Sequence, residues 1–420
     1  MIFREVDAAN NIDRIVLTND DIAFATDIDG LRFDFNFGCR VKLPDDTYDV
    51  NFIDMDSGSP LEKEYYPDNV VCTKIKYFLR IVIKVYKYGM EVWNHCYDAA
   101  GKNVRIELLM ADRLGDLLVF LPYIEKFQEK HQCNIYLTTT NKYVEIIKRN
   151  FNKFHIIAIE TVDNFNEKII SKLPENLYAT YYYRTGYPDI GFRHNDIRQI
   201  GLQKNAAEIL GLDVIKNYRH KLLPTEKAKC EREVKEPYVC ISMRASNTCK
   251  EWNNVNGWQE VVKYLRSIGY RVFCIDGDPV DKDIHYDGII ANGCELRAGY
   301  EPLQDRIDLL YYADFFIGVS SGLSWLAWAV GIPVIMISGF SLPYTEFENP
   351  YRIINKSVCH GCWNNMNFGD QIMYNGCPLY NGTERNFECT TAITPAMVTE
   401  VVDRLIKDYN LHPELGTTRI

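Results

Sequence analysis

Four cysteines are grouped in a short stretch near the end of the chain. Cys359 and Cys362 are separated by two residues, and Cys377 and Cys389 follow after fourteen and eleven more. A pair on a tight turn with two returning ligands is typical of a tetrahedral four-thiolate metal site, for which zinc and iron are equally suitable on chemical grounds. His360 could replace one thiolate, although so tight a turn should point its side chain away. We predict a structural metal with no open coordination position; chance clustering among thirteen cysteines is the alternative.

Length and charge restrict the classes of protein to which the chain can belong. At 420 residues it is long enough for two or three domains with substantial cores. Forty-seven basic and fifty-seven acidic residues give a net charge of −10 without a basic stripe, so we expect no nucleic-acid partner. The first ten residues lack an apolar core of signal-peptide length, which predicts no export signal. In the reducing compartment that this implies, grouped thiols indicate metal or redox chemistry more often than disulfides.

One uncharged stretch, residues 315–340, is long enough to cross a bilayer. Its local pattern favours another structure, because a Ser-Ser-Gly turn and Gly331 divide it into short pieces. The pieces fit a buried strand, a short helix and a second buried strand. We therefore predict a strand–helix–strand unit and no membrane span.

The periodicity of the chain predicts a β module followed by two α/β domains. Residues 1–100 alternate β-branched and aromatic residues with polar ones and contain turn pairs, which favours antiparallel strands. Strands then alternate with helical patterns in two successive blocks, which is typical of two α/β domains with a cleft between them. The predicted boundaries are 1–100 for the β module, 101–224 and 225–350 for the α/β domains, 351–395 for the cysteine segment and 396–420 for a C-terminal helix and tail.

Asp112 directly follows the first strand of the first α/β domain, at the edge where open parallel sheets place their ligands. At a helix N-terminus its carboxylate would be stabilised, and it could accept a proton from an alcohol. It could equally serve only as a helix cap, with Arg113 and Asp116 as solvated neighbours. The segment 110–122 (MADRLGDLLVFLP) resembles the opening motif of the glycosyltransferase family 9 heptosyltransferases, in which this aspartate is the catalytic base. The resemblance favours the base.

The polar loop within residues 241–253 carries two cations after a buried strand. Arg244 and Lys250 would lie at the carboxyl end of that strand, where they suit a diphosphate. An ordinary surface loop would also contain Arg and Lys. Family 9 enzymes keep a lysine that holds the donor phosphates in the equivalent loop, and Lys250 matches that lysine.

The segment 318–333 (GVSSGLSWLAWAVGIP) predicts an anion site at a helix start. Backbone N–H groups of Ser321, Gly322 and Leu323 could bind a phosphate, and Gly322 allows close approach. A small-residue turn for tight helix packing is the alternative. The segment also resembles family 9, which commonly has an Asp-Ser-Gly or Asp-Thr-Gly followed by a histidine. Here Ser320 replaces the acid and Trp325 replaces the histidine, so the roles of those two side chains in family 9 are not transferable.

Taken together, the Asp112 motif, the Lys250 loop, the 318–333 segment and the four cysteines resemble the bacterial autotransporter heptosyltransferases over roughly residues 1–400. The resemblance implies a GT-B fold, with two Rossmann-like domains that face a cleft. It also implies an N-terminal barrel-like β domain and a finger in which Cys359, Cys362, Cys377 and Cys389 hold one iron ion (Fe³⁺), with zinc as the alternative. No nicotinamide or flavin is expected.

The same resemblance implies a function. It implies a cytoplasmic bacterial enzyme that forms a large ring-like homo-oligomer such as a dodecamer. The enzyme would transfer heptose from ADP-heptose, with inversion, to serines of an autotransporter adhesin passenger domain. Asp112 would take the serine proton, and Lys250, Arg244 and the amides of Ser321 to Leu323, next to Ser320, would stabilise the departing ADP. Two alternatives stay open: a family 9 enzyme that acts on lipopolysaccharide or another saccharide, and a non-catalytic metal-bearing, nucleotide-binding assembly protein.

Overall fold

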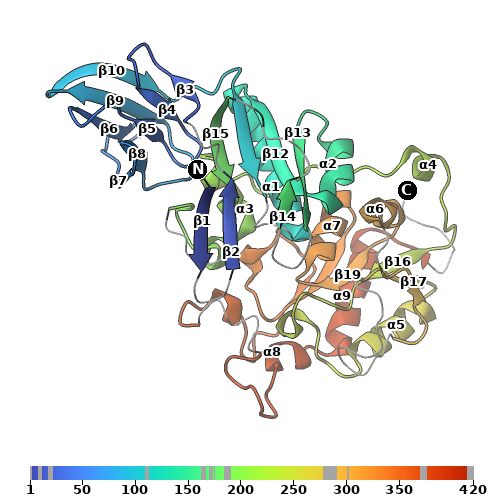
Figure 1. Cartoon of the computed structure of the whole chain (residues 1–420). Helices are drawn as coiled ribbons and strands as arrows, with labels where there is room; N and C mark the ends of the chain where they lie inside the picture. Colours follow the sequence, from blue (N-terminus) through green and yellow to red (C-terminus); the bar gives the residue numbers. More distant parts are fainter. Residues whose placement is uncertain are drawn as a thin grey trace. The chain divides into compact units, whose positions relative to one another are not determined.

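The computed structural model describes residues 2–7, 12–17, 22–108, 113–161, 167–169, 174, 176–183, 191–277, 291–299, 302–368 and 376–413. The chain divides into two compact units (Figure 1). Unit 1 comprises Met1–Asp112, Val119–Ile197 and Gln203–Lys216, and unit 2 comprises Arg113–Leu118, Arg198–Leu202 and Asn217–Ile420. The beginning of the long helix α1 (Leu114–His131) therefore belongs to unit 2, although most of that helix belongs to unit 1.

The N-terminal part of unit 1 is antiparallel, as its alternating pattern predicts. Strand β9 buries every second side chain, Ile81, Ile83 and Val85, because successive residues of a strand point to opposite faces. The described strands form a five-stranded sheet of order β3-β4-β5-β8-β7, a three-stranded sheet of order β10-β9-β6 and the pair β1-β2. Their bounds are β1 Ile2–Asp7, β2 Ile12–Leu17, β3 Phe24–Ala25, β4 Arg32–Asp34, β5 Arg40–Lys42, β6 Tyr48–Asp54, β7 Lys63–Tyr66, β8 Val70–Thr73, β9 Ile81–Lys87 and β10 Met90–Cys96.

The rest of unit 1 is an α/β fold on a sheet of order β14-β13-β12-β11-β15, in which only β14 runs antiparallel to its neighbour. Phe35 of the β module joins this sheet through backbone hydrogen bonds to Tyr178 and Thr180. The bounds are β11 Asn103–Glu107, β12 Asn134–Thr140, η2 Asn141–Tyr143, α2 Val144–Asn150, β13 His155–Thr161, β14 Glu167–Ile169, β15 Leu177–Tyr182 and α3 Ile197–Ile209.

Unit 2 contains a parallel sheet of order β18-β17-β16-β19-β20-β21. Its central strands are buried along their whole length, as expected for a parallel sheet with both faces covered. The bounds are α4 Glu226–Cys230, β16 Tyr238–Ile241, η3 Thr248–Lys250, α5 Gly257–Ser267, β17 Arg271–Cys274, β18 Glu295–Leu296, α6 Leu303–Tyr311, β19 Phe316–Val319, α7 Gly322–Val330, β20 Val334–Ile337, η4 Pro343–Thr345, β21 Arg352–Ile353, η5 Cys362–Asn364, α8 Glu388–Thr391 and α9 Pro395–Asp408.

The uncharged stretch 315–340 forms β19, α7 and β20, so the predicted strand–helix–strand unit is confirmed. Both strands pair side by side within the sheet of unit 2. Across the part of the chain that the structure describes, no helix has the length and apolar character that a membrane crossing requires.

Candidate functional site

The two loops predicted to bind a diphosphate leave adjacent strands of the unit 2 sheet. Strand β16 pairs with β19, and the order of the strands along the chain reverses between them. In open α/β sheets, ligands bind beyond the carboxyl ends of the strands at such a reversal. The loop after β16 carries Lys250, and the loop after β19 carries Ser320 to Gly322. The topology therefore places the second and third sequence motifs at one edge of one sheet.

The loop after β16 is fixed at its start by a buried carboxylate that the sequence did not single out. Asp276, which follows β17, accepts hydrogen bonds from Ser242 Oγ at 2.6 Å and from the backbone N–H of Arg244 at 3.2 Å. Glu251 accepts a bond from the backbone N–H of Ala245 at 3.2 Å. Asp276 thus holds the backbone of this loop, while the Arg244 side chain stays partly exposed.

Among the described residues, the cations Arg113, Arg244 and Lys250 have no anionic partner within bonding distance. Across the described residues, the side chains of Arg113, Arg244 and Lys250 make no hydrogen bond or ion pair. Lys250 is partly buried, and its pKa is lowered by that burial and by the positive charge of Arg113. Unpaired cations near each other are costly unless an anion binds among them. Arg113 and Lys250 lie close enough for their charges to interact, and a diphosphate would neutralise that charge.

Two helix N-termini meet beside these cations. A Cβ added at Gly322, the first residue of α7, would lie 2.9 Å from Leu114 Cβ, and one added at Gly115 would lie 2.8 Å from Trp325 Cδ1. Leu114 and Gly115 begin α1, so only glycines permit this approach. Both helices direct unsatisfied backbone N–H groups to their N-terminal ends, where anions are favoured. Trp325, which stands where family 9 has a histidine, is the packing surface that holds the start of α1.

The turn before α7 has one engaged amide and one unpartnered hydroxyl. The Ser321 N–H donates to Val319 O at 2.7 Å, so the open amides of the predicted anion site are those of Gly322 and Leu323. Ser321 Oγ is buried and has no hydrogen-bond partner among the described residues. A buried hydroxyl without a partner at a helix N-terminus is suited to an additional bond to a ligand.

Ser320, which replaces the acid of the motif, is hydrogen-bonded to a buried carboxylate from a later segment. Glu346 accepts hydrogen bonds from Ser320 Oγ and, at 2.7 Å, from Ser341 Oγ. Arg352 pairs with Glu346 at 2.6 Å, and the two side chains are only 6% and 3% exposed. Arg352 also donates to Ser338 Oγ at 2.9 Å. Glu346 contributes to the electrostatic field at Lys250, so a carboxylate is present at this edge of the sheet although the motif lacks one.

Asp112, the predicted base, lies outside the described residues, but Asp116 of the same motif lies within them. Asp116 is the third residue of α1 and is only 7% exposed, so it is not the solvated neighbour that the helix-cap alternative assumes. Burial raises its pKa to about 6, while the charges of Arg113 and Lys250 oppose that rise. A carboxylate with a pKa near neutrality is a stronger base than an ordinary aspartate. Its i, i+3 relation to Arg113 could be read from the sequence; its burial could not.

The four predicted metal ligands come together with a fifth thiol. Cys362 and Cys377 pack in one buried cluster with Cys249, Phe340 and Phe387. Burial raises the pKa of Cys362 to about 11 and that of Cys389 to about 12, and in both cases the neighbouring cysteines, Cys359 and Cys249 among them, raise it further.

Such mutual repulsion would be relieved by a cation that binds the thiolates, so the donor set fits a metal. Across the described residues, however, no three His, Cys, Asp or Glu side chains are in metal-binding geometry, and the four-cysteine site stays a prediction. His360 is exposed, and its Nδ1 donates to Val358 O at 2.8 Å, as expected from its place in the turn.

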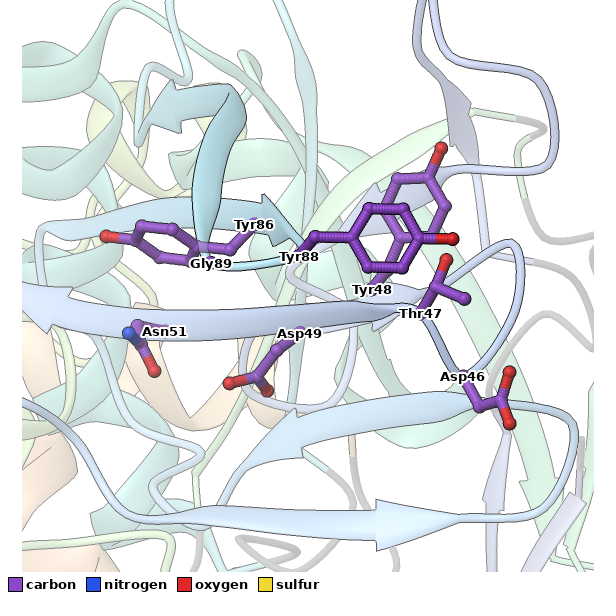
Figure 2. Close-up of a pocket in the computed structure, with 8 residues that line it drawn as sticks. All are labelled: Asp46, Thr47, Tyr48, Asp49, Asn51, Tyr86, Tyr88 and Gly89. Carbon is purple, nitrogen blue, oxygen red and sulfur yellow. The ribbon is translucent and has the colours of Figure 1, made fainter.

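A separate shallow pocket of about 290 Å³ lies in the β module (Figure 2). The ammonium of Lys87 lies 4.6 Å from the ring centre of Tyr48 and 5.9 Å from that of Tyr88, at the β9–β10 turn. The lining residues are Asp46, Thr47, Tyr48, Asp49, Asn51, Tyr86, Tyr88 and Gly89. The pocket contains none of the predicted donor or metal residues.

Two family models match separate parts of the chain. Residues 28–89 match the family model of the glycosyltransferase TibC N-terminal domain, and residues 197–371 match that of glycosyltransferase family 9 (heptosyltransferase). The chain is 39% identical over 396 residues to the autotransporter heptosyltransferase BAHTCr of Citrobacter rodentium, an alignment that covers 90% of this chain and 89% of that protein. This chain belongs to the autotransporter heptosyltransferases. The predictions of the family and of a glycosyltransferase are thereby confirmed.

Two further relatives bear on how autotransporter heptosyltransferases work. The crystal structure of the iron-containing dodecameric glycosyltransferase TibC from enterotoxigenic Escherichia coli aligns with a TM-score of 0.83 at 34% identity, covering 93% of this chain and all of that chain. TibC has also been solved in complex with ADP-D-beta-D-heptose, and that structure aligns with a TM-score of 0.82 at 33% identity, covering 94% and 100% of the two chains. BimC of Burkholderia thailandensis is called an inactive autotransporter heptosyltransferase. It is 33% identical to this chain over 378 residues, which cover 89% of this chain and 85% of BimC.

Proposed function

We propose that this chain is a protein O-heptosyltransferase that transfers heptose from ADP-heptose to serine side chains of an autotransporter adhesin passenger domain, in the bacterial cytoplasm before export. The observation that carries the proposal is the pair of cations Arg113 and Lys250, whose charges influence each other and which have no hydrogen-bond or ion-pair partner among the described residues, beside the N-termini of α1 and α7. This arrangement suits the diphosphate of a nucleotide sugar. The ADP-heptose complex of TibC supports the choice of donor.

The cations and amides have separate tasks in this scheme. Lys250 and Arg244 would bind the two phosphates by charge-assisted hydrogen bonds. The N–H groups of Gly322 and Leu323 would hold one phosphate at the start of α7, with Ser321 Oγ as a further donor. As the bond between the anomeric carbon and the phosphate oxygen breaks, negative charge grows on ADP, and these groups stabilise it in place.

The base is a carboxylate of the segment 112–116. A serine hydroxyl is a poor nucleophile at neutral pH, so a base must take its proton as the oxygen attacks the anomeric carbon with inversion. Asp112 is the candidate from the motif, and the raised pKa and buried position of Asp116 support Asp116 as its rival. No catalytic metal is needed for either proton transfer.

We further infer that Cys359, Cys362, Cys377 and Cys389 hold one iron ion, and that the enzyme forms a large homo-oligomer such as a dodecamer. The iron-containing dodecamer of TibC supports both inferences. A four-thiolate metal would crosslink three chain segments and has no open position for a substrate, so its contribution is structural. Zinc stays the alternative metal.

The experiment that tests the proposal is intact-mass measurement of a passenger fragment after incubation with purified enzyme and ADP-heptose. We expect the unmodified enzyme to add heptose units. Of the Asp112→Ala and Asp116→Ala variants, the one that lacks the base should transfer about 10²- to 10⁴-fold more slowly while it still binds ADP-heptose. No transfer by the unmodified enzyme with bound donor would refute the assignment of a protein acceptor.

A second candidate is a non-catalytic assembly protein that keeps the nucleotide fold, because one relative of comparable similarity is called inactive. The same experiment separates the two. Binding of ADP-heptose without transfer to a passenger fragment, a lipopolysaccharide core or another saccharide would favour the non-catalytic protein. Transfer only to a saccharide would instead favour the family 9 alternative.

A further inference from the structure

The position of Lys250 is set by its backbone, because its ammonium has no hydrogen-bond partner among the described residues. The residue lies in the short helix η3, Thr248–Lys250, and its neighbours on both sides are anchored. On the N-terminal side, Cys249 is only 3% exposed and packs in the thiol cluster with Cys362 and Cys377. The residue directly before Lys250 is therefore packed against two of the predicted metal ligands.

On the C-terminal side, the loop is bonded to the segment that directly follows Cys389. Asn253 donates to Thr390 Oγ1 from its side-chain Nδ2 at 3.0 Å and from its backbone at 3.4 Å. Trp252 Nε1 donates to Ile393 O at 2.9 Å, and Asn254 Nδ2 donates to Thr391 O at 3.0 Å. These segments are 137 to 141 residues apart in sequence, so the bonds require the fold that brings the two segments together.

The finger itself packs tightly on the edge of the sheet near Glu346. A Cβ added at Gly339 would lie 2.1 Å from Cys389 O, and the Gly361 N–H donates to Gly339 O at 2.8 Å. Both cysteine-bearing segments thus pack on the chain that follows β20. A metal bound to the four predicted ligands would hold these segments together, and its loss would release the partners of Asn253 and Cys249.

We propose that the cysteine finger holds the loop that follows β16 and carries Lys250. Cys249 is a positioning residue packed against the metal-binding thiols. Metal occupancy thereby sets the affinity for the diphosphate through Lys250. In this proposal the four predicted ligands complete a tetrahedral site, which would leave Cys249 outside the coordination sphere. The inference rests on the proposed function only in its use of ADP as the ligand. It assigns the finger a task beyond stability, namely the placement of the phosphate-binding cation.

The test measures ADP affinity by calorimetry and metal content by elemental analysis on the full-length protein. We expect metal removal to weaken ADP binding by about tenfold in the unmodified enzyme. In Lys250→Ala, which already lacks the cation, ADP binding should be weak and should change less than twofold on metal removal. This non-additivity is what coupling through Lys250 requires.

Two variants of the metal-loaded protein keep the proposal testable if the metal-free protein unfolds. Cys249→Ala and Thr390→Val should each retain one metal per chain, with an unchanged visible absorption band, and each should bind ADP about three- to tenfold more weakly. Cys133→Ala is the matched control, because Cys133 is a buried thiol of unit 1 outside the cluster. It should leave both readouts unchanged.

Each outcome is decisive for the coupling. Unchanged ADP affinity in both loaded variants, loss of metal in Cys249→Ala, or a purified protein without metal would overturn it. If the loaded enzyme binds ADP and transfers heptose but its affinity does not respond to these changes, only the coupling fails. If it binds ADP normally and never transfers heptose, the proposed function fails while the coupling still stands or falls on the affinities.

Discussion

Asp116→Asn should stabilise the folded protein while it removes a candidate base. Burial raises the pKa of Asp116 from 3.8 to about 6, even though Arg113 and Lys250 oppose the rise. The folded state therefore binds the proton more tightly than the unfolded state does. The penalty is absent below about pH 4, grows as the pH rises to about 6 and is constant above that value. A neutral asparagine of nearly the same shape removes it.

The size of the effect follows from the two pKa values. At about 1.4 kcal/mol per pH unit, the difference sets an upper limit of about 3 kcal/mol at pH 7.5. Because the asparagine amide must also be accommodated in a buried place, we expect a gain of about 1–2 kcal/mol. For a unit of about 200 residues, this corresponds to a rise of about 2–8 °C in the melting temperature.

The assay is thermal unfolding at pH 7.5 and pH 4.5, on either side of the sequence pI of 5.4. The matched control is Asp305→Asn, because Asp305 is also the third residue of its helix but is exposed. Asp305→Asn should lower stability by a few tenths of a kcal/mol through the helix dipole. An Asp116→Asn protein that melts at or below the unmodified temperature at pH 7.5, or that gains equally at both pH values, would refute the reasoning.

Two further predictions concern the loop before α7. Glu346→Gln should destabilise unit 2 by about 3 kcal/mol in urea unfolding, because it leaves Arg352 buried without its charge partner. Glu346→Gln combined with Arg352→Met should recover part of that loss. Equal stability of the single variant and the unmodified protein would contradict this prediction. Gly322→Ala should weaken ADP binding by about tenfold, because its Cβ would force Leu114 away. The control variant Gly277→Ala should bind ADP normally, because nothing lies within 4 Å of the Cβ that it adds. Normal ADP binding by Gly322→Ala would show that the two helix starts do not form the anion site.

Much of the fold could be predicted because it depends on local pattern. The β19–α7–β20 unit follows from apolar runs interrupted by a Ser-Ser-Gly turn and by Gly331, which has φ of 101° and ends α7 as only a glycine does easily. The start of α1 at Leu114 follows from apolar residues on one helical face. The prediction that the β module is antiparallel is confirmed for the same reason. Whether its sheets close into a barrel depends on long-range pairing, which the local pattern does not contain.

The sequence by itself also determined the chemistry available to this protein: four grouped thiols, a lysine after a buried strand and a glycine turn before an apolar helix. Only the tertiary structure decided which of these residues act together. Three features depend on residues that are distant in sequence. They are the burial of Asp116, the hydrogen bond from Ser320 to the Glu346 carboxylate and the packing of Cys249 among the finger thiols. Burial and long-range contact are properties of the packed chain, and a pKa or a cation's position follows from them, so no spacing of residue types could have predicted them.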